Sequence, residues 1–177
     1  TQRVAHWSQN YDGNALLDLA ICVDARPIAG NAALFAPLKS QLLSLSSHAG
    51  MLRQLATPVL GFATPLTLFG KLKASDQGVD IKKGGIFPIV HGLRVLALQA
   101  GVADTNSFRR AEQLVDIGVM HRRDADDLLQ SLSVFLRLRL SDQLRKLSAG
   151  QPFANQIDIK ALRKLDRELL RDALHVV

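Results

Sequence analysis

The sequence has few aromatic residues and almost no cysteine. Only 5% of its 177 residues are Phe, Trp or Tyr, and Cys22 is the single cysteine. One cysteine excludes an intrachain disulfide framework and a zinc site built from several cysteines. The scarcity of aromatic residues argues against a β-sandwich or barrel, and against a surface on which nucleic-acid bases stack. No apolar run reaches the roughly 18 residues of a membrane helix, so we expect no membrane partner and no signal peptide.

What the sequence does contain is leucine and alanine at helical spacing, with 47% apolar residues overall. Leu34, Leu38, Leu42 and Leu45, for example, follow one face of a helix that Asn31 would cap. Proline and glycine separate the apolar runs. The pattern predicts an all-α bundle. The expected helices cover residues 15–23, 31–50, 51–61, 86–100, 104–117, 123–149 and 159–176. Asp104 or Thr105 would cap the fifth helix, and Leu162, Leu165 and Leu169 of the last one would face inward.

Residues 62–85 interrupt the helical pattern with proline, glycine and charged side chains. They predict a long loop, with a small hairpin near 68–82 that turns around Asp76-Gln77-Gly78. Gly84-Gly85 is not a phosphate-binding loop, because the Gly-Lys-Ser/Thr ending is missing.

The sequence offers no catalytic motif. Two aspartates that hold Mg²⁺ for nucleotide transfer usually stand one residue apart on a strand, but Asp124 and Asp126 open a helix and point to different sides. The five histidines are scattered, and Cys22 lies in an apolar helix, where a small core residue is expected. The chain begins at Thr1 without methionine. We therefore expect a non-catalytic piece of a longer protein.

Two groups of polar residues lie on otherwise apolar helix faces, and they say more about function. In the long helix, Arg139 and Gln143 fall near the centre of the apolar face around Leu132, whereas Arg137 falls about 140° away and should be solvated. In the central helix, His91 and Arg94 lie three residues apart among apolar neighbours. Either these groups form internal ion pairs and a polar seam, or they face a cleft, together with Asp80 and Lys82 of the loop, that receives a phosphate or carboxylate.

The net charge of +6 says less about function than these polar residues do. The basic residues of the last helix alternate with Asp166, Glu168 and Asp172 at spacings that allow helical ion pairs. A solvated face accounts for this pattern, and we expect no nucleic-acid partner.

An ordered set of short motifs resembles a known family. These are 23–28 with Gly30, 79–90 followed by Arg94 and Ala97-Leu98, Thr105-Asn106-Ser107 with Arg109-Arg110, and 136–140 with Gln143. Together they resemble the nucleotidyltransferase substrate-binding domain of bacterial signalling proteins. The sequence departs from the usual pattern at Ile21-Cys22-Val23, at His91, where the family often has an acid, and at Gly70 or Lys71.

The resemblance implies a helical bundle like the C-terminal domain of kanamycin nucleotidyltransferase. It implies that residues 1–30 form a junction helix and linker after a catalytic domain similar to that of PII-protein uridylyltransferase, and that 31–177 form the substrate-binding domain. Mg²⁺ and a nucleoside triphosphate would belong to the catalytic domain, and this chain would need no cofactor. Sensory CBS or cyclic-nucleotide-binding domains, a PII-like protein substrate and a cytoplasmic location are further expectations.

On this interpretation, Arg94 and Arg139 bind an anionic group of the substrate. Gln143, His91 and Asn106 orient that group, and Asp80 and Lys82 shape the adjacent loop. The alternative is a regulatory protein-interaction bundle without a small-molecule ligand.

The interpretation predicts that the 177-residue chain does not transfer nucleotides by itself. Incubation with labelled UTP or ATP and Mg²⁺ should label neither the chain nor an added acceptor protein above a protein-free blank. Robust turnover would contradict the assignment of the chemistry to another domain.

Overall fold

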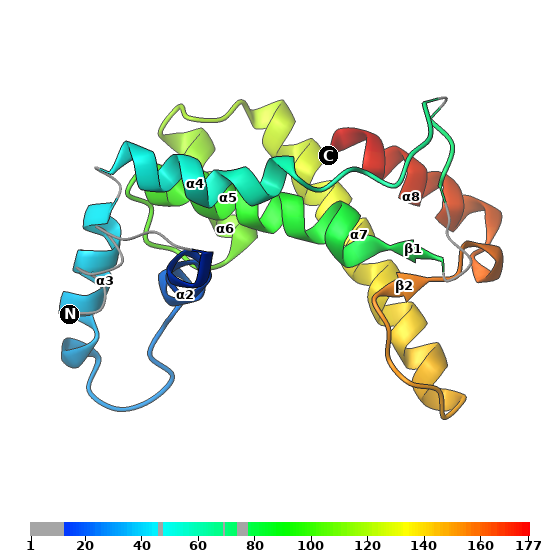
Figure 1. Cartoon of the computed structure of the whole chain (residues 1–177), viewed down its shortest axis with the longest axis horizontal. Helices are drawn as coiled ribbons and strands as arrows, with labels where there is room; N and C mark the ends of the chain where they lie inside the picture. Colours follow the sequence, from blue (N-terminus) through cyan, green and yellow to red (C-terminus); the bar gives the residue numbers. More distant parts are fainter. Residues whose placement is uncertain (1–12, 46–47, 69, 74–77) are drawn as a thin grey trace. The chain divides into compact units, whose positions relative to one another are not determined.

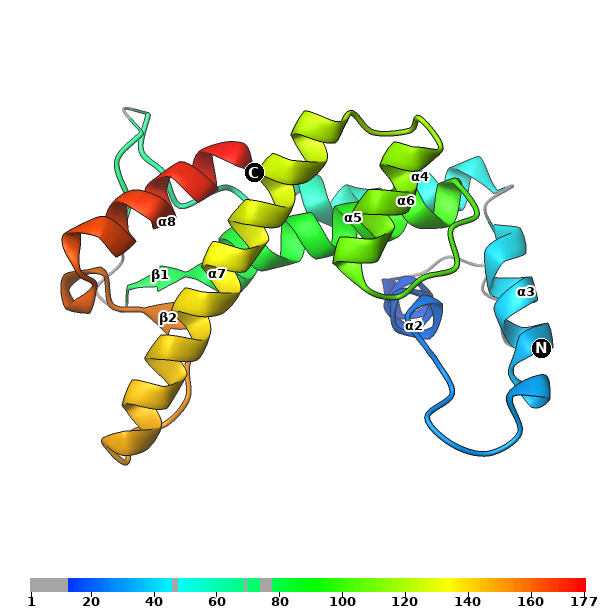
Figure 2. The same ribbon diagram turned by 180° about the vertical axis from the view of Figure 1, so that it is seen from behind.

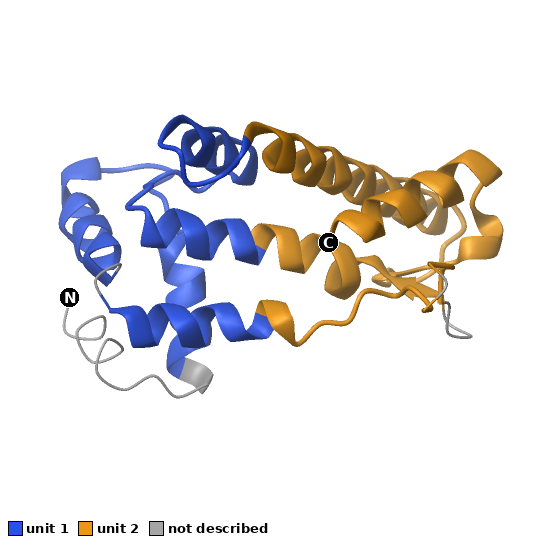
Figure 3. Ribbon diagram, turned by 90° about the horizontal axis from the view of Figure 1, so that it is seen from above, with its two compact units in different colours: residues 1–58, 91–121 blue, residues 59–90, 122–177 orange. Residues whose placement is uncertain are grey.

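A computed structural model describes residues 13–45, 48–68, 70–73 and 78–177. The chain divides into two compact units, and each is built from two separate stretches of sequence (Figure 3). Unit 1 comprises residues 1–58 and 91–121, and unit 2 comprises residues 59–90 and 122–177.

The regular elements in the described part of unit 1 are all helices (Figure 1). Its elements are α2 (Gly13–Val23), the short 3₁₀ helix η1 (Ala32–Leu34), α3 (Ala36–Ser44), α4 (Ala49–Leu60) except its last two residues, α5 (Phe87–Gln99) from His91 onward, and α6 (Ser107–Asp116). Side chains from α2, α4, α5 and the α3 segment form one buried apolar cluster, which includes Leu19, Val23, Leu42, Leu45, Met51, Leu55, Val95 and Leu98.

The segment after Asn31 is a helix in two parts. Asn31 is the cap, as expected, and its side chain accepts a hydrogen bond from the Ala33 amide at 3.0 Å. The expectation of one continuous helix is wrong, because Pro37 lacks an amide hydrogen and its ring crowds the carbonyl four residues earlier. The helix therefore starts again at Ala36. Leu34 consequently leaves the buried face and is 80% exposed.

The described part of unit 2 combines the helices α7 and α8 with short helical turns and two short strands. Its elements are the strand β1 (Val79–Asp80), the π-helical turn η3 (Lys82–Ile86), the first turn of α5, α7 (Arg122–Ser148), the strand β2 (Gln156–Ile157), the 3₁₀ helix η4 (Ile159–Ala161) and α8 (Lys164–Val176). Helices α7 and α8 lie side by side (Figures 1 and 2). Apolar side chains buried in this unit include Ile81, Leu132, Phe135, Leu138, Ile157 and Leu170.

The two strands are far apart in the sequence. β1 pairs with β2 in antiparallel register, with Val79 opposite Ile157 and Asp80 opposite Gln156. The turn of the expected hairpin falls on residues 74–77, which lie outside the described residues. Within the loop before them, Leu66 forms an isolated antiparallel bridge with Leu72.

The last helix begins later than its leucine pattern indicates. Asp158 caps η4 by accepting a hydrogen bond from the Lys160 amide at 2.9 Å, and Leu162 and Arg163 then adopt extended backbone angles. This break resets the rotation of the helix, so Leu165 is exposed and Leu170, Ala173 and Leu174 are buried. The expectation of Leu165 facing inward is therefore wrong.

The glycine pair before α5 allows close packing of its neighbours. A Cβ atom on Gly85 would lie 2.7 Å from Cε2 of the buried Phe135, and one on Gly84 would lie 2.5 Å from Cδ of Pro65. Real Cβ atoms do not approach that closely, so both positions require glycine for space.

The structure confirms an all-α fold, with one two-stranded antiparallel pair among the described residues. The helices expected over 15–23, 51–61, 86–100 and 123–149 are present as α2, α4, α5 and α7. Where the chain is described, it has no helix with the length and apolar character to cross a membrane.

Replacing Gly85 by alanine should destabilise the protein by about 1–3 kcal/mol, because the new methyl group would overlap the Phe135 ring. Gly92→Ala is the matched control in α5, since nothing lies within 4 Å of the position that its methyl group would take. That change should stabilise by about 0.5–1 kcal/mol, as expected for glycine in a helix interior. Urea denaturation measures both changes, and equal stability of the two variants would contradict the packing argument.

Candidate functional site

A carboxylate between two arginines forms the polar centre of unit 1. Asp24, just after α2, accepts hydrogen bonds on Oδ2 from Nε and Nη2 of Arg94, at 2.8 and 2.6 Å. Its Oδ1 accepts a hydrogen bond from Nη2 of Arg110 at 2.5 Å. Arg94 belongs to α5 and Arg110 to α6, so one carboxylate connects three segments of the unit.

Arg110 is the most deeply buried charged residue of this cluster, with 1% of its surface exposed. Besides Asp24, it contacts the backbone carbonyl of Asp104, to which its Nε donates at 2.7 Å. Nη1 has no hydrogen-bond partner among the described residues. Arg110 is not among the site residues predicted from the sequence. Its position beside Ala111 and four residues before Leu114, on the same buried face, is the signal that it is buried.

His91 is held as a neutral ring. Its Nε2 lies 2.7 Å from the Leu55 carbonyl, which can only accept, so Nε2 carries the proton. Nδ1 therefore accepts from Nη1 of Arg94, also at 2.7 Å. Burial lowers the pKa of His91 below its usual value, and the positive charge of Arg94 adds to this effect.

The charges around Asp24 determine its ionisation. Burial alone would raise the pKa of Asp24, but the hydrogen bonds from Arg94 and Arg110 outweigh it, and the pKa is lowered. Lys39 lies beside the same cluster and donates to the Val23 carbonyl at 2.9 Å. Burial lowers the pKa of Lys39, and the positive charge of Arg110 lowers it further. The cluster is thus an internal ionic network with its carboxylate ionised.

Three of the seven residues selected from the sequence lie in unit 1, and each contacts the protein itself. For Arg94 and His91, the contacts are those of the internal alternative, an ion pair and a satisfied polar seam. Asn106 caps α6, where Asp104 or Thr105 was expected. Its Oδ1 accepts from the amides of Phe108 and Arg109, at 3.0 and 3.2 Å.

The other four selected residues lie in unit 2. Arg139 is half-buried, with Nη2 donating to Asn155 at 3.3 Å, and its buried Nε has no hydrogen-bond partner among the described residues. Asp80 accepts from the Lys83 amide at 3.0 Å, which starts the turn η3, and Lys82 is exposed. Gln143 lines an apolar groove. A single cleft shared by all seven residues stays a prediction.

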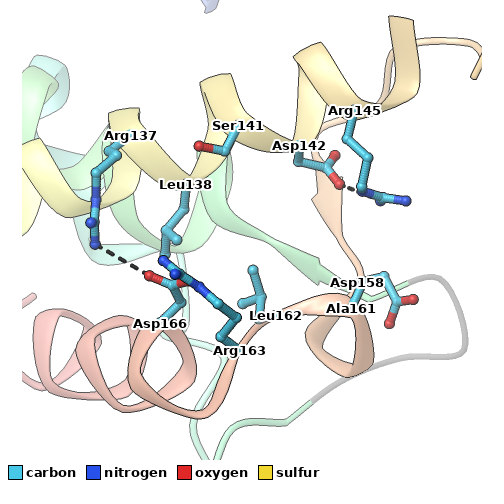
Figure 4. Close-up of a pocket in the computed structure, with 10 residues that line it drawn as sticks. All are labelled: Arg137, Leu138, Ser141, Asp142, Arg145, Asp158, Ala161, Leu162, Arg163 and Asp166. Atoms are coloured by element: carbon cyan, nitrogen blue, oxygen red, sulfur yellow. Dashed lines mark hydrogen bonds and ion pairs between the residues drawn. The ribbon is translucent and has the colours of Figure 1, made fainter. Parts of the chain in front are cut away.

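A second group of charges surrounds a hollow of about 250 Å³ in unit 2 (Figure 4). We call it the arginine hollow. It is formed by α7 on one side and by η4 with the start of α8 on the other. Its lining residues are Arg137, Leu138, Ser141, Asp142, Arg145, Asp158, Ala161, Leu162, Arg163 and Asp166.

In the arginine hollow, each of two buried carboxylates lies between two cations. Asp142 pairs with Arg145 at 2.7 Å and with Lys146 at 2.6 Å. Asp166 pairs with Arg163 at 3.0 Å and with Arg137 at 3.5 Å. The exposed Asp158 also lines the hollow, so the lining holds three arginines and three aspartates, and Lys146 lies outside it.

The arginines of the hollow are accessible, unlike those around Asp24. The side chains of Arg137, Arg145 and Arg163 are 53%, 51% and 82% exposed. Arg163 is also the residue before α8, and its side chain makes no capping hydrogen bond there. The amide dipoles at the start of that helix add to the positive potential of the hollow. Arg137 was expected in solvent, whereas Arg145 and Arg163 were not selected from the sequence, because no local motif marks them.

Neither group has the composition of a metal centre. The residues that the structure describes include no cluster of three or more His, Cys, Asp or Glu side chains that could hold a metal ion. Cys22 packs against the apolar cluster of unit 1, and burial raises the pKa of its thiol, with the charge of Asp18 adding to the effect. The Cys22 thiol is thus not activated as a nucleophile.

The comparison with known families identifies the domain. Residues 49–177, more than half of the chain, match the family described as "putative nucleotidyltransferase substrate binding domain". The chain belongs to this family. No curated protein and no solved structure matches the sequence in the corresponding comparisons.

The family stretch contains Arg94, Arg110 and the whole arginine hollow, whereas Asp24 precedes it. In this member of the nucleotidyltransferase substrate-binding family, Asp24 thus attaches the end of α2 to the family stretch, and Lys39 attaches α3 to the same end of α2. A role of residues 1–30 as a junction to another domain stays a prediction.

Asp24→Asn should destabilise the protein by about 3–5 kcal/mol, because it leaves Arg94 and the buried Arg110 without their carboxylate. Asp18→Asn is the control, since Asp18 lies on α2, the helix that ends just before Asp24, and is exposed. Urea denaturation at pH 7 measures the difference. A loss below about 1 kcal/mol, as for a surface ion pair, would contradict the role of Asp24.

Wild type and the Asp24→Asn variant also test the ionisation of Asp24. Because its folded-state pKa is lowered, the ionised carboxylate stabilises the fold above the unfolded-state pKa of about 4. This stabilisation is lost as the pH falls from about 4 through the lowered folded-state pKa. The stability difference between wild type and Asp24→Asn should therefore be constant from about pH 5 to 7 and shrink below about pH 4.

Proposed function

We propose that this substrate-binding domain holds an anionic group of a substrate, a phosphate or a carboxylate, in the arginine hollow of unit 2. The observation that supports the proposal is that Asp142 and Asp166 are buried, whereas the three arginines of the lining have accessible guanidinium groups. Arginine suits this role because its planar donors match the oxygens of phosphate and carboxylate.

The buried aspartates prepare the arginines for a ligand. Asp166 accepts a hydrogen bond from Nε of Arg163 at 3.0 Å, which occupies one of the five N–H donors of that guanidinium, and it forms an ion pair with Arg137 at 3.5 Å. The remaining donors are available, while the ion pair limits the rotamers of the side chain. A ligand then has less conformational entropy to remove when it binds. The Ser141 hydroxyl lies in the same hollow and can donate a further hydrogen bond.

Within a complete nucleotidyltransferase, the contribution of this domain is positioning. Holding a substrate at a fixed place near an active site replaces an encounter in solution and supplies much of the rate. The transfer step, with Mg²⁺ and a nucleoside triphosphate, belongs in this proposal to a neighbouring catalytic domain. The proposal extends to a biological setting in signal transduction. In that setting, sensory domains belong to the same protein, and a PII-like protein is the acceptor.

A second candidate function is supported by a different feature. An apolar groove at the end of α7 favours a protein-interaction role.

The arginine hollow predicts that the chain binds anions through Arg137 and Arg163. Isothermal titration with ATP, UTP and inorganic pyrophosphate should show binding of at least one of them. The double variant Arg137→Gln/Arg163→Gln should bind at least about tenfold more weakly, because each lost charge-assisted hydrogen bond is worth about 1.5–3 kcal/mol.

Arg171→Gln is the matched control, because Arg171 is an exposed, ion-paired arginine of α8 outside the hollow. It should leave the affinity unchanged. Equal weakening by both changes would mean that binding follows net charge and not the site. The proposal fails if none of the three anions binds at millimolar concentration.

A further inference from the structure

The C-terminal half of α7 presents an apolar face that the described chain leaves uncovered. Leu136, Leu140, Leu144 and Leu147 are 42%, 57%, 55% and 62% exposed. At about 100° per residue, their side chains lie within an arc of about 80° on one side of the helix. Leu136 lies only about 40° from the buried Leu132 on the helix and is nevertheless exposed. Large apolar side chains at these spacings normally contact another element.

This face is part of a groove. Leu140, Gln143, Leu144 and Leu147 of α7 form one wall, and Phe153 of the segment after the helix forms the other. The groove has a volume of about 270 Å³, and Gln143 is its one polar side chain. Small-molecule sites are usually larger, about 300–1,000 Å³, and carry several orienting polar groups. A groove with this lining fits apolar side chains of another polypeptide.

The charged side chains that flank the leucine face on α7 are basic. Between residues 128 and 157 the sequence has four basic residues, Arg137, Arg139, Arg145 and Lys146, and a single acid, Asp142. Asp142 is buried, and its carboxylate pairs with Arg145 and Lys146. On the helix, Arg137 lies about 20° beyond one edge of the leucine face and Arg139 about 60° beyond the other. An occupant of the groove thus meets positive charge on both sides.

We propose that this groove docks an acidic amphipathic helix of a partner protein. Such a helix would insert leucine, isoleucine or phenylalanine side chains spaced i, i+4 and i+7 between α7 and Phe153, which is the usual way a helix occupies a groove. Its flanking aspartates and glutamates would face Arg137 and Arg139. The proposal shares Arg137 with the arginine hollow, but docking itself depends on the leucine face and Phe153, so it can fail or hold whatever the result of the anion titrations.

Charge and shape argue against two other occupants. A second copy of the chain would pair the same patch with itself and place like-charged arginines against one another. An amphipathic helix that lies on a membrane needs an apolar face that protrudes into the lipid, whereas this face is the wall of a groove shared with Phe153.

The test uses fluorescein-labelled helical peptides and the intact chain in fluorescence anisotropy. The first peptide has leucines at i, i+4, i+7 and i+11 with flanking glutamates, the second has lysines in place of the glutamates, and the third has alanines in place of the leucines. We expect binding of the first alone, and at least about tenfold weaker binding by the Leu140→Ser/Leu144→Ser variant. Binding should also weaken between about 50 and 300 mM salt, because the flanking charges are exposed.

Leu165→Ser is the matched control, since Leu165 is 63% exposed on α8 and lies outside the groove. It should bind the first peptide like the wild type, and circular dichroism should show that all variants keep their helices. Equal binding of acidic and basic peptides, or no binding of the acidic one, would overturn the proposal. So would a dimer, or binding to phosphatidylserine vesicles, that Leu140→Ser/Leu144→Ser abolishes.

Discussion

The carboxylate of Asp24 is the interaction on which the polar interior of unit 1 depends. A guanidinium that is 1% exposed, like that of Arg110, is tolerated only when a carboxylate and backbone acceptors surround it. Asp24 supplies that carboxylate to Arg110 and to Arg94 at the same time, and Arg94 in turn supplies the hydrogen bond that fixes the tautomer of His91. The helices α5 and α6 are therefore joined to the end of α2 through one side chain.

Unit 2 uses the same pairing of aspartate with arginine in the opposite arrangement. Around Asp24 the arginines are covered, whereas in the arginine hollow Asp142 and Asp166 are buried and the arginines paired with them are accessible. Only the second arrangement leaves guanidinium donors for a ligand. The distinction follows from burial and not from residue type, so the proposed ligand-binding role falls on the accessible arginines and the structural role on the buried ones.

Sequence periodicity predicted most helices but not their rotation after a break. The long helix α7 and the cap Asn31 follow from local signals, whereas Pro37 and the extended Leu162–Arg163 step reset the helix phase, so Leu34 and Leu165 are exposed. The candidate site was harder to predict. Arg94 was identified as a polar residue on an apolar face, but its partner Asp24 lies 70 residues away in sequence. The pairing of β1 with β2 is equally non-local, and no single sequence specifies such partners by pattern.

The central claim is that the arginines fall into an internal class and a ligand-binding class. Proton–nitrogen NMR of the arginine Nε groups tests it directly during a titration with inorganic pyrophosphate. We expect shifts for the signals of Arg137, Arg145 and Arg163, with those of Arg94 and Arg110 unchanged. Shifts of Arg94 and Arg110, with none for the arginines of the hollow, would contradict the claim.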